Sequence, residues 1–378
     1  MKIILFDTPD SLEDFFPLTY TRSIADLRCG IFTIKERWEK LLQTQVYIQT
    51  TELLTPLYEV PPAEDENILL ISSSVFPTQE LVAEILKLEP GEELYTDTHL
   101  IAQKKAPGID QIKSSDLYAK VFYQPMDLIF YNNQVIEDDW KWINTSHEKV
   151  LEASIASSPE NIKIEDSAKV TGAILNADEG PIYIGENVVI QEGAVVRGPV
   201  VILENTTIMS QAHIRHGVTI GPHCMIGGEI KQSIILGYSN KAHEGYLGDS
   251  YIGQFVNLGA GTTTSNLKNN YHNIDLWNDR QLAFLDSGRI KAGSLIGDYV
   301  HTAIGTLFNS GTYVGIGSNI FGGGLQTKYI APFTWGITEN YEESLFFDFV
   351  KKVTSLKQVT LSSEYLNMLK TLFKLLNG

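Results

Sequence analysis

The chain has 378 residues, of which 43% are hydrophobic and 20% charged, and its formal net charge is -17. This composition supports a sizeable core and argues against disorder, and the length suggests two or three domains. The acidic balance disfavours nucleic acid as a partner, because binding a phosphate backbone requires positive charge. The two cysteines exclude a disulfide framework and a cysteine-built zinc site.

Membrane insertion and secretion are also disfavoured. The apolar run at residues 2–6 is too short for a signal peptide. No window approaches the roughly 20 apolar residues of a membrane span. We therefore expect a soluble, reduced, cytoplasmic protein without a membrane partner.

Strand-like and helix-like segments alternate in the first part of the chain. Residues 2–6, 46–50 and 68–72 are short apolar runs typical of buried strands, whereas 33–43 and 79–87 have helical patterns. This alternation predicts an α/β domain over residues 1–150. The serine- and proline-containing stretch 154–161 then predicts the approach to a different architecture.

A six-residue period begins beyond that stretch. Every sixth residue forms an aliphatic, β-branched column, and Cys224 lies in a second column of mostly smaller residues. The phase slips over 232–246 and resumes at Ile252, and a third run extends from Ile296 to Ile320. The first column consists of Ile184, Ile190, Val196, Ile202, Ile208, Ile214, Ile220 and Ile226.

This period predicts a parallel β-helix over residues 160–335. Three six-residue faces would close one coil, and residues about eighteen apart would stack at the strand spacing of about 4.8 Å. The alternative, a β-sandwich with a period of two, does not predict a six-residue column. The position of Cys224 predicts a buried packing thiol.

The last segment, 340–378, has a helical pattern. Apolar residues recur every three or four positions over 342–359 and 363–376, which predicts two helices. Ser362 or Ser363 is the expected N-cap of the second. We expect this tail to cover an end or a side of the coil.

The stretch 241–266, KAHEGYLGDSYIGQFVNLGAGTTTSN, closely resembles the acetyltransferase half of bifunctional UDP-N-acetylglucosamine pyrophosphorylase / glucosamine-1-phosphate N-acetyltransferases. The resemblance extends over roughly residues 160–335. It implies a left-handed β-helix, which is an exception to the right-handed crossover rule, and a homotrimer. It also implies transfer of acetyl from acetyl-CoA to the amine of an amino-sugar phosphate.

The resemblance assigns site roles to individual positions. The family's general base matches His243, and a residue beside the coenzyme A arm matches Ala260. The positions that hold the acceptor match Arg215, Lys231, Tyr246, Asn257 and Asn266.

These residue types suit the implied chemistry. An amino sugar is largely an ammonium ion at neutral pH, and a histidine with a pKa near roughly 6.5 can accept its proton. Arg215 and Lys231 would supply a guanidinium fork and a point charge for the phosphate. Backbone N–H groups of residues 259–261 could stabilise the thioester oxygen as negative charge develops on it.

The chain departs from the family pattern around this stretch. The family's Lys-Ala-Gly-His is one residue tighter here, at 240–243, and a longer excursion follows at 275–288. The excursion carries Trp277, Arg280 and Phe284 and is a candidate acceptor lid or trimer contact. These changes bear on the identity of the acceptor more than on the reaction type.

Three histidines, His213, His216 and His223, form a loose cluster in the sequence. Because no cysteine or carboxylate stands at ligand spacing, structural or phosphate-contacting roles are favoured over a metal site.

Residues 1–150 more faintly resemble the nucleotidyltransferase half of the same family. Residues 16–22, FPLTYTR, resemble the segment after that family's nucleotide loop, but the Gly-rich loop is absent. Arg22 and Arg28 are the nearby cations, and we assign them to nucleotide binding. Mg²⁺ is a candidate cofactor with unknown ligands, because serines at 72–74 stand where the magnesium carboxylate is expected. Such losses favour weak, altered or absent transfer activity.

Asp127 has two interpretations. It is either a substitute metal ligand or, in the favoured interpretation, a buried capping residue.

Three functions follow as hypotheses. The first is an acetyl-CoA-dependent N-acetyltransferase acting on an amino-sugar phosphate or a nucleotide-linked amino sugar. The second is a sugar-1-phosphate nucleotidyltransferase whose coil is a trimer scaffold, and the two activities can coexist. The third is a non-catalytic scaffold or regulatory protein, because a hexapeptide coil by itself demonstrates only architecture.

Overall fold

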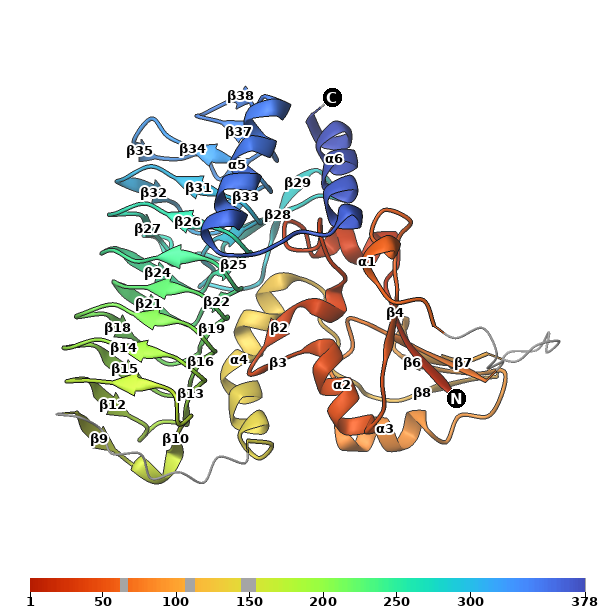
Figure 1. Ribbon diagram of the computed structural model, residues 1–378. Helices are drawn as coiled ribbons and strands as arrows, with labels where there is room; N and C mark the ends of the chain where they lie inside the picture. Colours follow the sequence, from red (N-terminus) through yellow and green to blue (C-terminus); the bar gives the residue numbers. More distant parts are fainter. Residues whose placement is uncertain (62–66, 106–112, 144–153, 378) are drawn as a thin grey trace.

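The computed structural model describes residues 1–61, 67–105, 113–143 and 154–377. Its two large parts lie side by side (Figure 1). A β-helical coil forms one half of the molecule, and an α/β domain lies along the side of the coil with helix α4 (Pro125–Trp140) between them. The end of the predicted first domain, 144–150, lies outside the described residues.

The N-terminal domain is built on a six-stranded mixed sheet in the order β4-β1-β5-β7-β6-β8. Strand β1 pairs in parallel with β4 and β5, whereas β7 is antiparallel to β5 and β6. The strands are β1 (Lys2–Phe6), β4 (Tyr47–Gln49), β5 (Ile68–Ser72), β6 (Glu92–Thr96), β7 (His99–Lys104) and β8 (Lys113–Asp116). The predicted α/β class is therefore confirmed.

Threonine N-caps begin three helices of this domain. The side chains of Thr8, Thr33 and Thr78 accept the backbone N–H groups of Ser11, Glu36 and Leu81. These helices are α1 (Pro9–Asp14), α2 (Ile34–Leu42) and α3 (Gln79–Ile85), and the short strands β2 (Arg28–Cys29) and β3 (Phe32–Thr33) precede α2.

The second half of the chain forms the predicted parallel β-helix, whose three faces are parallel sheets. The N-terminal domain and the C-terminal helices pack on one of these faces, which we call the covered face. It contains β10 (Ile162–Ile164), β13 (Ile182–Ile184), β16 (Val200–Ile202), β19 (Val218–Ile220), β22 (Ile234–Ile235), β25 (Tyr251–Ile252), β30 (Leu295–Ile296), β33 (Tyr313–Val314) and β36 (Tyr329–Ile330). The second face contains β11 (Lys169–Val170), β14 (Val189–Ile190), β17 (Thr207–Ile208), β20 (Met225–Ile226), β23 (Asn240–Lys241), β26 (Asn257–Leu258), β31 (His301–Thr302), β34 (Asn319–Ile320), β37 (Thr334–Trp335) and β38 (Glu339–Asn340). The third face contains β9 (Ile155–Ser157), β12 (Ile174–Asn176), β15 (Val195–Arg197), β18 (His213–Ile214), β21 (Glu229–Lys231) and β24 (Tyr246–Gly248), followed by β27 (Thr263–Thr264), β32 (Thr306–Phe308) and β35 (Gly324–Leu325).

The aliphatic column of the sequence lines the inside of this coil. All eight members from Ile184 to Ile226 are buried in one core cluster, because each strand turns one side chain inward at the same place. Cys224 is buried among them, as predicted, and its thiol donates to the Leu236 carbonyl. The phase slip over 232–246 corresponds to shorter coils, since Ile220 pairs with Ile235 and Ile235 with Ile252.

Two C-terminal helices, α5 (Glu343–Leu356) and α6 (Ser363–Asn377), cover the side of the coil, as the tail pattern predicts. Ser362 caps α6 by accepting the backbone N–H of Tyr365. Beneath α5, a ladder of rings occupies one corner of successive coils, with adjacent centroids 4.8–5.0 Å apart. The ladder consists of His223, Tyr238, Phe255 and Tyr299, all with positive φ.

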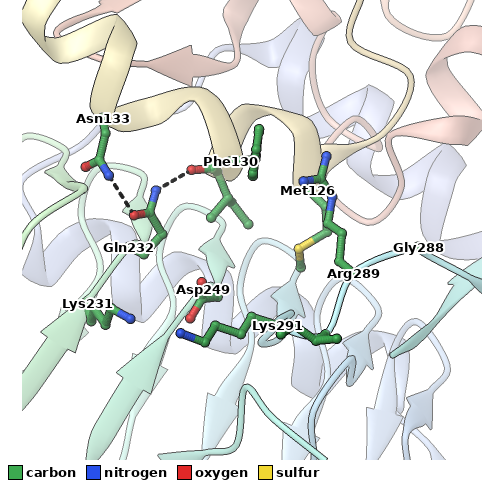
Figure 2. Close-up of a pocket in the computed structure, with 11 residues that line it drawn as sticks. Met126, Phe130, Asn133, Lys231, Gln232, Asp249, Gly288, Arg289 and Lys291 are labelled. Carbon is green, nitrogen blue, oxygen red and sulfur yellow. Dashed lines mark hydrogen bonds between the residues drawn. The ribbon is translucent and has the colours of Figure 1, made fainter. Parts of the chain in front are cut away.

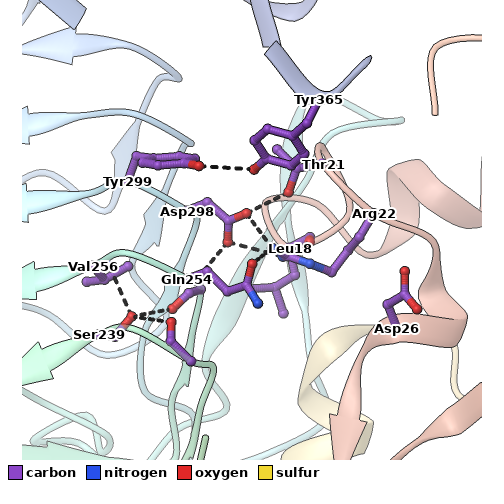
Figure 3. A network of polar contacts seen from close by, with 12 residues as sticks. Leu18, Thr21, Arg22, Asp26, Ser239, Gln254, Val256, Asp298, Tyr299 and Tyr365 are labelled. Carbon is purple, nitrogen blue, oxygen red and sulfur yellow. Dashed lines mark hydrogen bonds and ion pairs between the residues drawn. The ribbon is translucent and has the colours of Figure 1, made fainter. Parts of the chain in front are cut away.

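A buried ion pair joins the two halves (Figure 3). Arg22 of the N-terminal domain donates to both carboxylate oxygens of Asp298, which follows β30 in the coil. Thr21 also donates to Asp298, and the Tyr299 hydroxyl donates to Tyr365 of α6. The N-terminal domain, the covered face and the C-terminal helices therefore meet at one polar junction inside a shared hydrophobic core.

The excursion after Asn266 forms a hairpin of β28 (Asp275–Asn278) and β29 (Ala283–Asp286). At its turn, Arg280 donates to Asp10 and Asp14 of α1 at 2.9 Å each. The hairpin thus contacts the N-terminal domain of its own chain, a role that the sequence did not suggest.

Replacing Asp298 by asparagine should destabilise the protein by about 3–5 kcal/mol, because Arg22 would remain buried without a compensating charge. Urea unfolding measures this change. Asp10→Asn is the matched control, because Asp10 is 70% exposed in its pair with Arg280 and should cost less than about 1 kcal/mol. Equal effects of the two variants would show that the buried pair does not join the halves.

Candidate functional site

The turn between β23 and β24 carries His243 at the corner of the second and third faces. His243 is exposed and lines a cavity of about 510 Å³ together with Asn257 and Ala260. The structure therefore brings together three of the residues that the resemblance singled out. Gly259 sits where a Cβ atom would lie 2.7 Å from the Thr302 carbonyl oxygen, so only glycine fits at this point of the cavity wall.

A lysine inside the coil holds the His243 turn. Lys241 occupies the interior column, paired in register with Ile226, and is 2% exposed. Its ammonium group donates to the carbonyls of His243 and Glu244 at 2.7 and 2.8 Å, and burial lowers the pKa of Lys241 to about 8. Lys241 was not among the predicted site residues. A lysine in an otherwise aliphatic column is the sequence signal that could have identified it.

A second group of predicted residues lies at the other edge of the third face. Asn266 donates to the Tyr246 hydroxyl at 3.1 Å and also to the Asp249 carboxylate. The Tyr246 ring lies over Gly248, where a Cβ atom would be 2.2 Å from the hydroxyl. Burial raises the pKa of Tyr246 to about 12. The segment 246–249, Tyr-Leu-Gly-Asp, therefore packs so that Tyr246 lies against Asn266.

The two predicted phosphate ligands lie at this same edge. Arg215 pairs with Glu229 at 2.8 Å, and both side chains are partly exposed. Lys231 lines a cavity of about 590 Å³ between α4 and the coil (Figure 2), which we call the interdomain cavity. His243 and Lys231 thus line different cavities of one chain.

The two arginines assigned to nucleotide binding line a third cavity, of about 300 Å³, where the N-terminal domain meets the coil. Arg22 already forms the buried ion pair with Asp298. Arg28 lies 3.6 Å from Glu36 and donates to the Ile31 carbonyl. The structure places the two cations side by side but gives each a partner within the chain.

The structure shows no cluster of metal-ligating side chains for the candidate Mg²⁺ within the described residues. They contain no group of three or more His, Cys, Asp or Glu side chains that could hold a metal ion. Ser72 and Ser74, at the end of β5, contact the His99 ring. Asp127 caps α4 and pairs with Arg289 at 3.0 Å, so the capping interpretation is correct.

The histidine cluster of the sequence is dispersed in space. His223 belongs to the ring ladder, and His213 lies on the third face in register with Glu229. Neighbouring cations and burial lower the pKa of His216, with burial the larger cause.

A buried polar row that the sequence analysis missed lies at the carboxyl ends of β4, β1 and β5. Asp7, Thr50 and Ser73 directly follow these strands, and the strand register aligns them. The carboxyl oxygens of Asp7 and the hydroxyls of Thr50 and Ser73 make no hydrogen bond of good geometry. Burial raises the pKa of Asp7 to about 6, although nearby hydroxyls partly oppose the shift. Ligands of open α/β sheets bind at this edge.

Comparisons with known proteins match the two halves separately. Residues 3–148 match the family described as Sugar nucleotidyl transferase, and residues 199–229 match Bacterial transferase hexapeptide (six repeats). The first part of the chain is therefore similar to sugar nucleotidyl transferases, and part of the coil is similar to hexapeptide-repeat transferases. These two matches confirm the predicted resemblance of the first part of the chain to a nucleotidyltransferase and of the second part to a hexapeptide-repeat transferase.

Two curated relatives are named as bifunctional proteins. Bifunctional protein GlmU of Trichodesmium erythraeum is 38% identical over 86 residues, which are 22% of this chain and 18% of the relative. A bifunctional sugar-1-phosphate nucleotidylyltransferase/acetyltransferase of Sulfurisphaera tokodaii is 30% identical over 167 residues, 44% of this chain and 39% of the relative. The match thus spans less than half of the length of each relative.

Among solved structures, the UDP-N-acetylglucosamine acyltransferase of Francisella novicida aligns at 16% identity with a TM-score of 0.36, over 59% of this chain and 85% of that chain.

Within the described residues, none of the helices has the length and apolar character needed to cross a membrane.

Replacing Asp7 by asparagine should make stability less dependent on pH. The carboxyl pKa is raised from 3.8 to about 6 in the folded protein, so the folded state is penalised increasingly as pH rises from about 4 to 6, by up to about 3 kcal/mol. Asp7→Asn should therefore gain stability relative to the wild type over this window. Urea unfolding at pH 4, 5.5 and 7 measures the gain, and exposed Asp97→Asn is the control. A difference that stays constant with pH would contradict the buried-carboxyl interpretation.

Proposed function

We propose that the protein is an acetyl-CoA-dependent N-acetyltransferase that acts on an amino-sugar phosphate or a nucleotide-linked amino sugar. The observation that carries this proposal is the cavity shared by His243, Asn257 and Ala260, which are three positions of the family frame. His243 would remove the proton from the acceptor ammonium group, and the neutral amine would attack the thioester carbonyl. Backbone N–H groups near Gly259 would stabilise the developing oxyanion.

The acceptor phosphate would bind at the other edge of the third face. Lys231 and Arg215 supply the positive charge there, and Tyr246 with Asn266 supplies hydrogen-bonding groups for sugar hydroxyls. Because the base and these groups line different cavities of one chain, a complete site requires a second copy. We therefore infer a homotrimer whose sites lie between neighbouring coils.

Exposed apolar side chains around the His243 cavity support this assembly. Met225 and Ile304 line the cavity and are 40% and 76% exposed. Leu307 and Leu325 pair in register on the third face and are also exposed. An exposed apolar patch beside a functional cavity is typical of a subunit interface. The covered face is closed to such a contact, because the N-terminal domain and the C-terminal helices already pack on it.

Replacing His243 by alanine should reduce kcat for acetyl transfer by about 10²–10⁴-fold, because general-base catalysis contributes that factor. Release of coenzyme A from acetyl-CoA with glucosamine-1-phosphate measures turnover. His272→Ala, at an exposed histidine just before the excursion, is the control and should retain activity. Unchanged turnover of the His243 variant would remove the proposed base.

Replacing Leu325 by lysine should convert the trimer to monomers, because a charge would be buried in the apolar interface. Light scattering coupled to size-exclusion chromatography measures the mass. Leu356→Lys on α5, where the side chain is 82% exposed, should leave the mass unchanged. A wild-type monomer would refute the assembly.

Sugar-1-phosphate nucleotidyl transfer is the second candidate, favoured by the family match of residues 3–148. The serines at the end of β5 and the internal partners of Arg22 and Arg28 weigh against unaltered activity. Release of pyrophosphate from several nucleoside triphosphates and a sugar phosphate tests it. Absence of acetyl-CoA binding by calorimetry, together with no pyrophosphate release, would favour a non-catalytic scaffold.

A further inference from the structure

The interdomain cavity has an excess of unpaired positive charge. It is lined by Lys231, Lys291, Arg289 and one carboxylate, Asp249. Arg289 is paired with Asp127, whereas the ion pairs found in the described part of the chain include neither Lys231 nor Lys291. In Figure 2 the ammonium groups of Lys231 and Lys291 point toward each other, and Asp249 lies beside them.

This arrangement favours an anionic ligand. Asp249 accepts a hydrogen bond from Asn266, and its single negative charge faces the positive charges of Lys231 and Lys291. Two ammonium groups that face each other repel, and the repulsion falls when an anion lies between them. In a chain with a net charge of -17, such a local excess of cations requires a specific reason.

The opposite wall of the cavity is largely apolar, with Asn133 as its polar member. It is formed by α4, with Met126 and Ile129 buried and Phe130 57% exposed. The Arg289 guanidinium lies 4.2 Å from the centroid of the Phe130 ring. An exposed ring next to a planar guanidinium is a stacking platform for an aromatic base. A bare sugar phosphate has no group that requires this wall.

We propose that the interdomain cavity binds a nucleoside phosphate, with the phosphate on Lys231 and Lys291 and the base on Phe130 and Arg289. The proposal rests on the proposed function in one respect: it assigns the acceptor as a nucleotide-linked amino sugar rather than a free sugar phosphate. Helix α4 of the N-terminal domain would then form part of the acceptor site of the coil.

Calorimetry on the full chain tests this proposal without turnover. The probes are UDP, ADP, inorganic phosphate and glucosamine-1-phosphate. Lys291→Ala should weaken binding of all probes by about tenfold or more, since it removes one of two free cations. Phe130→Ala should weaken UDP or ADP by about fivefold or more and leave inorganic phosphate unchanged, because only the base stacks on the ring.

Matched controls separate this site from others. Lys87→Ala and Tyr118→Ala remove an exposed lysine and an exposed aromatic residue elsewhere, and neither should change binding. Nucleotide binding that is insensitive to both Lys291→Ala and Phe130→Ala would place the nucleotide in the N-terminal domain and overturn the proposal. So would equal affinity for inorganic phosphate and nucleotide, or no binding of any probe.

If the variants fail to fold, the proposal can still be tested on the wild-type chain. Lysine acylation followed by mass spectrometry should show that UDP protects Lys231 and Lys291 but not Lys87, and absence of protection would also overturn the proposal. His243→Ala should leave nucleotide affinity unchanged. If the wild-type chain transfers no acetyl group but binds UDP with an affinity that depends on Phe130, the proposed function is removed and the site is kept.

Discussion

The whole arrangement depends on the covering of one face of the coil by the same chain. The N-terminal domain and α5–α6 share a hydrophobic core with the outer side of that face, and Arg22–Asp298 anchors the contact. Apolar burial supplies most of the favourable free energy, whereas the buried pair imposes the relative position, because either charge left alone would be costly. With this face closed, the cavities that could hold substrates lie at the remaining edges.

A side chain inside the coil fixes the turn that carries His243. Successive strands turn aliphatic side chains inward, and the column is interrupted by Lys241, whose ammonium group binds the carbonyls of the His243 turn. A buried ammonium is tolerated because backbone oxygens replace its water. The ring ladder at another corner packs under α5 and offsets the cost of left-handed backbone at non-glycine residues. The coil thus holds the turn of the proposed base His243 from the inside while the histidine itself is exposed.

The N-terminal domain is similar to sugar nucleotidyl transferases over residues 3–148. At the edge where ligands of open α/β sheets bind, it places the polar row of Asp7, Thr50 and Ser73. Its helix α4 is used in a second way, as the wall of a cavity that opens onto the coil. The hairpin of the coil also contacts this domain, because Arg280 donates to Asp10 and Asp14 of α1.

The sequence by itself determined the α/β class of the first half, the parallel coil with its inward column, and the helical tail, because periodicity reports which side chains are buried. It also selected His243, Asn257 and Ala260, which share a cavity because they lie on neighbouring coils. Only the tertiary structure decided that Arg22 meets Asp298, that Lys231 faces Lys291, and that α4 lines their cavity. These contacts join residues from separate segments, and no local pattern encodes which surfaces of two folded halves will meet.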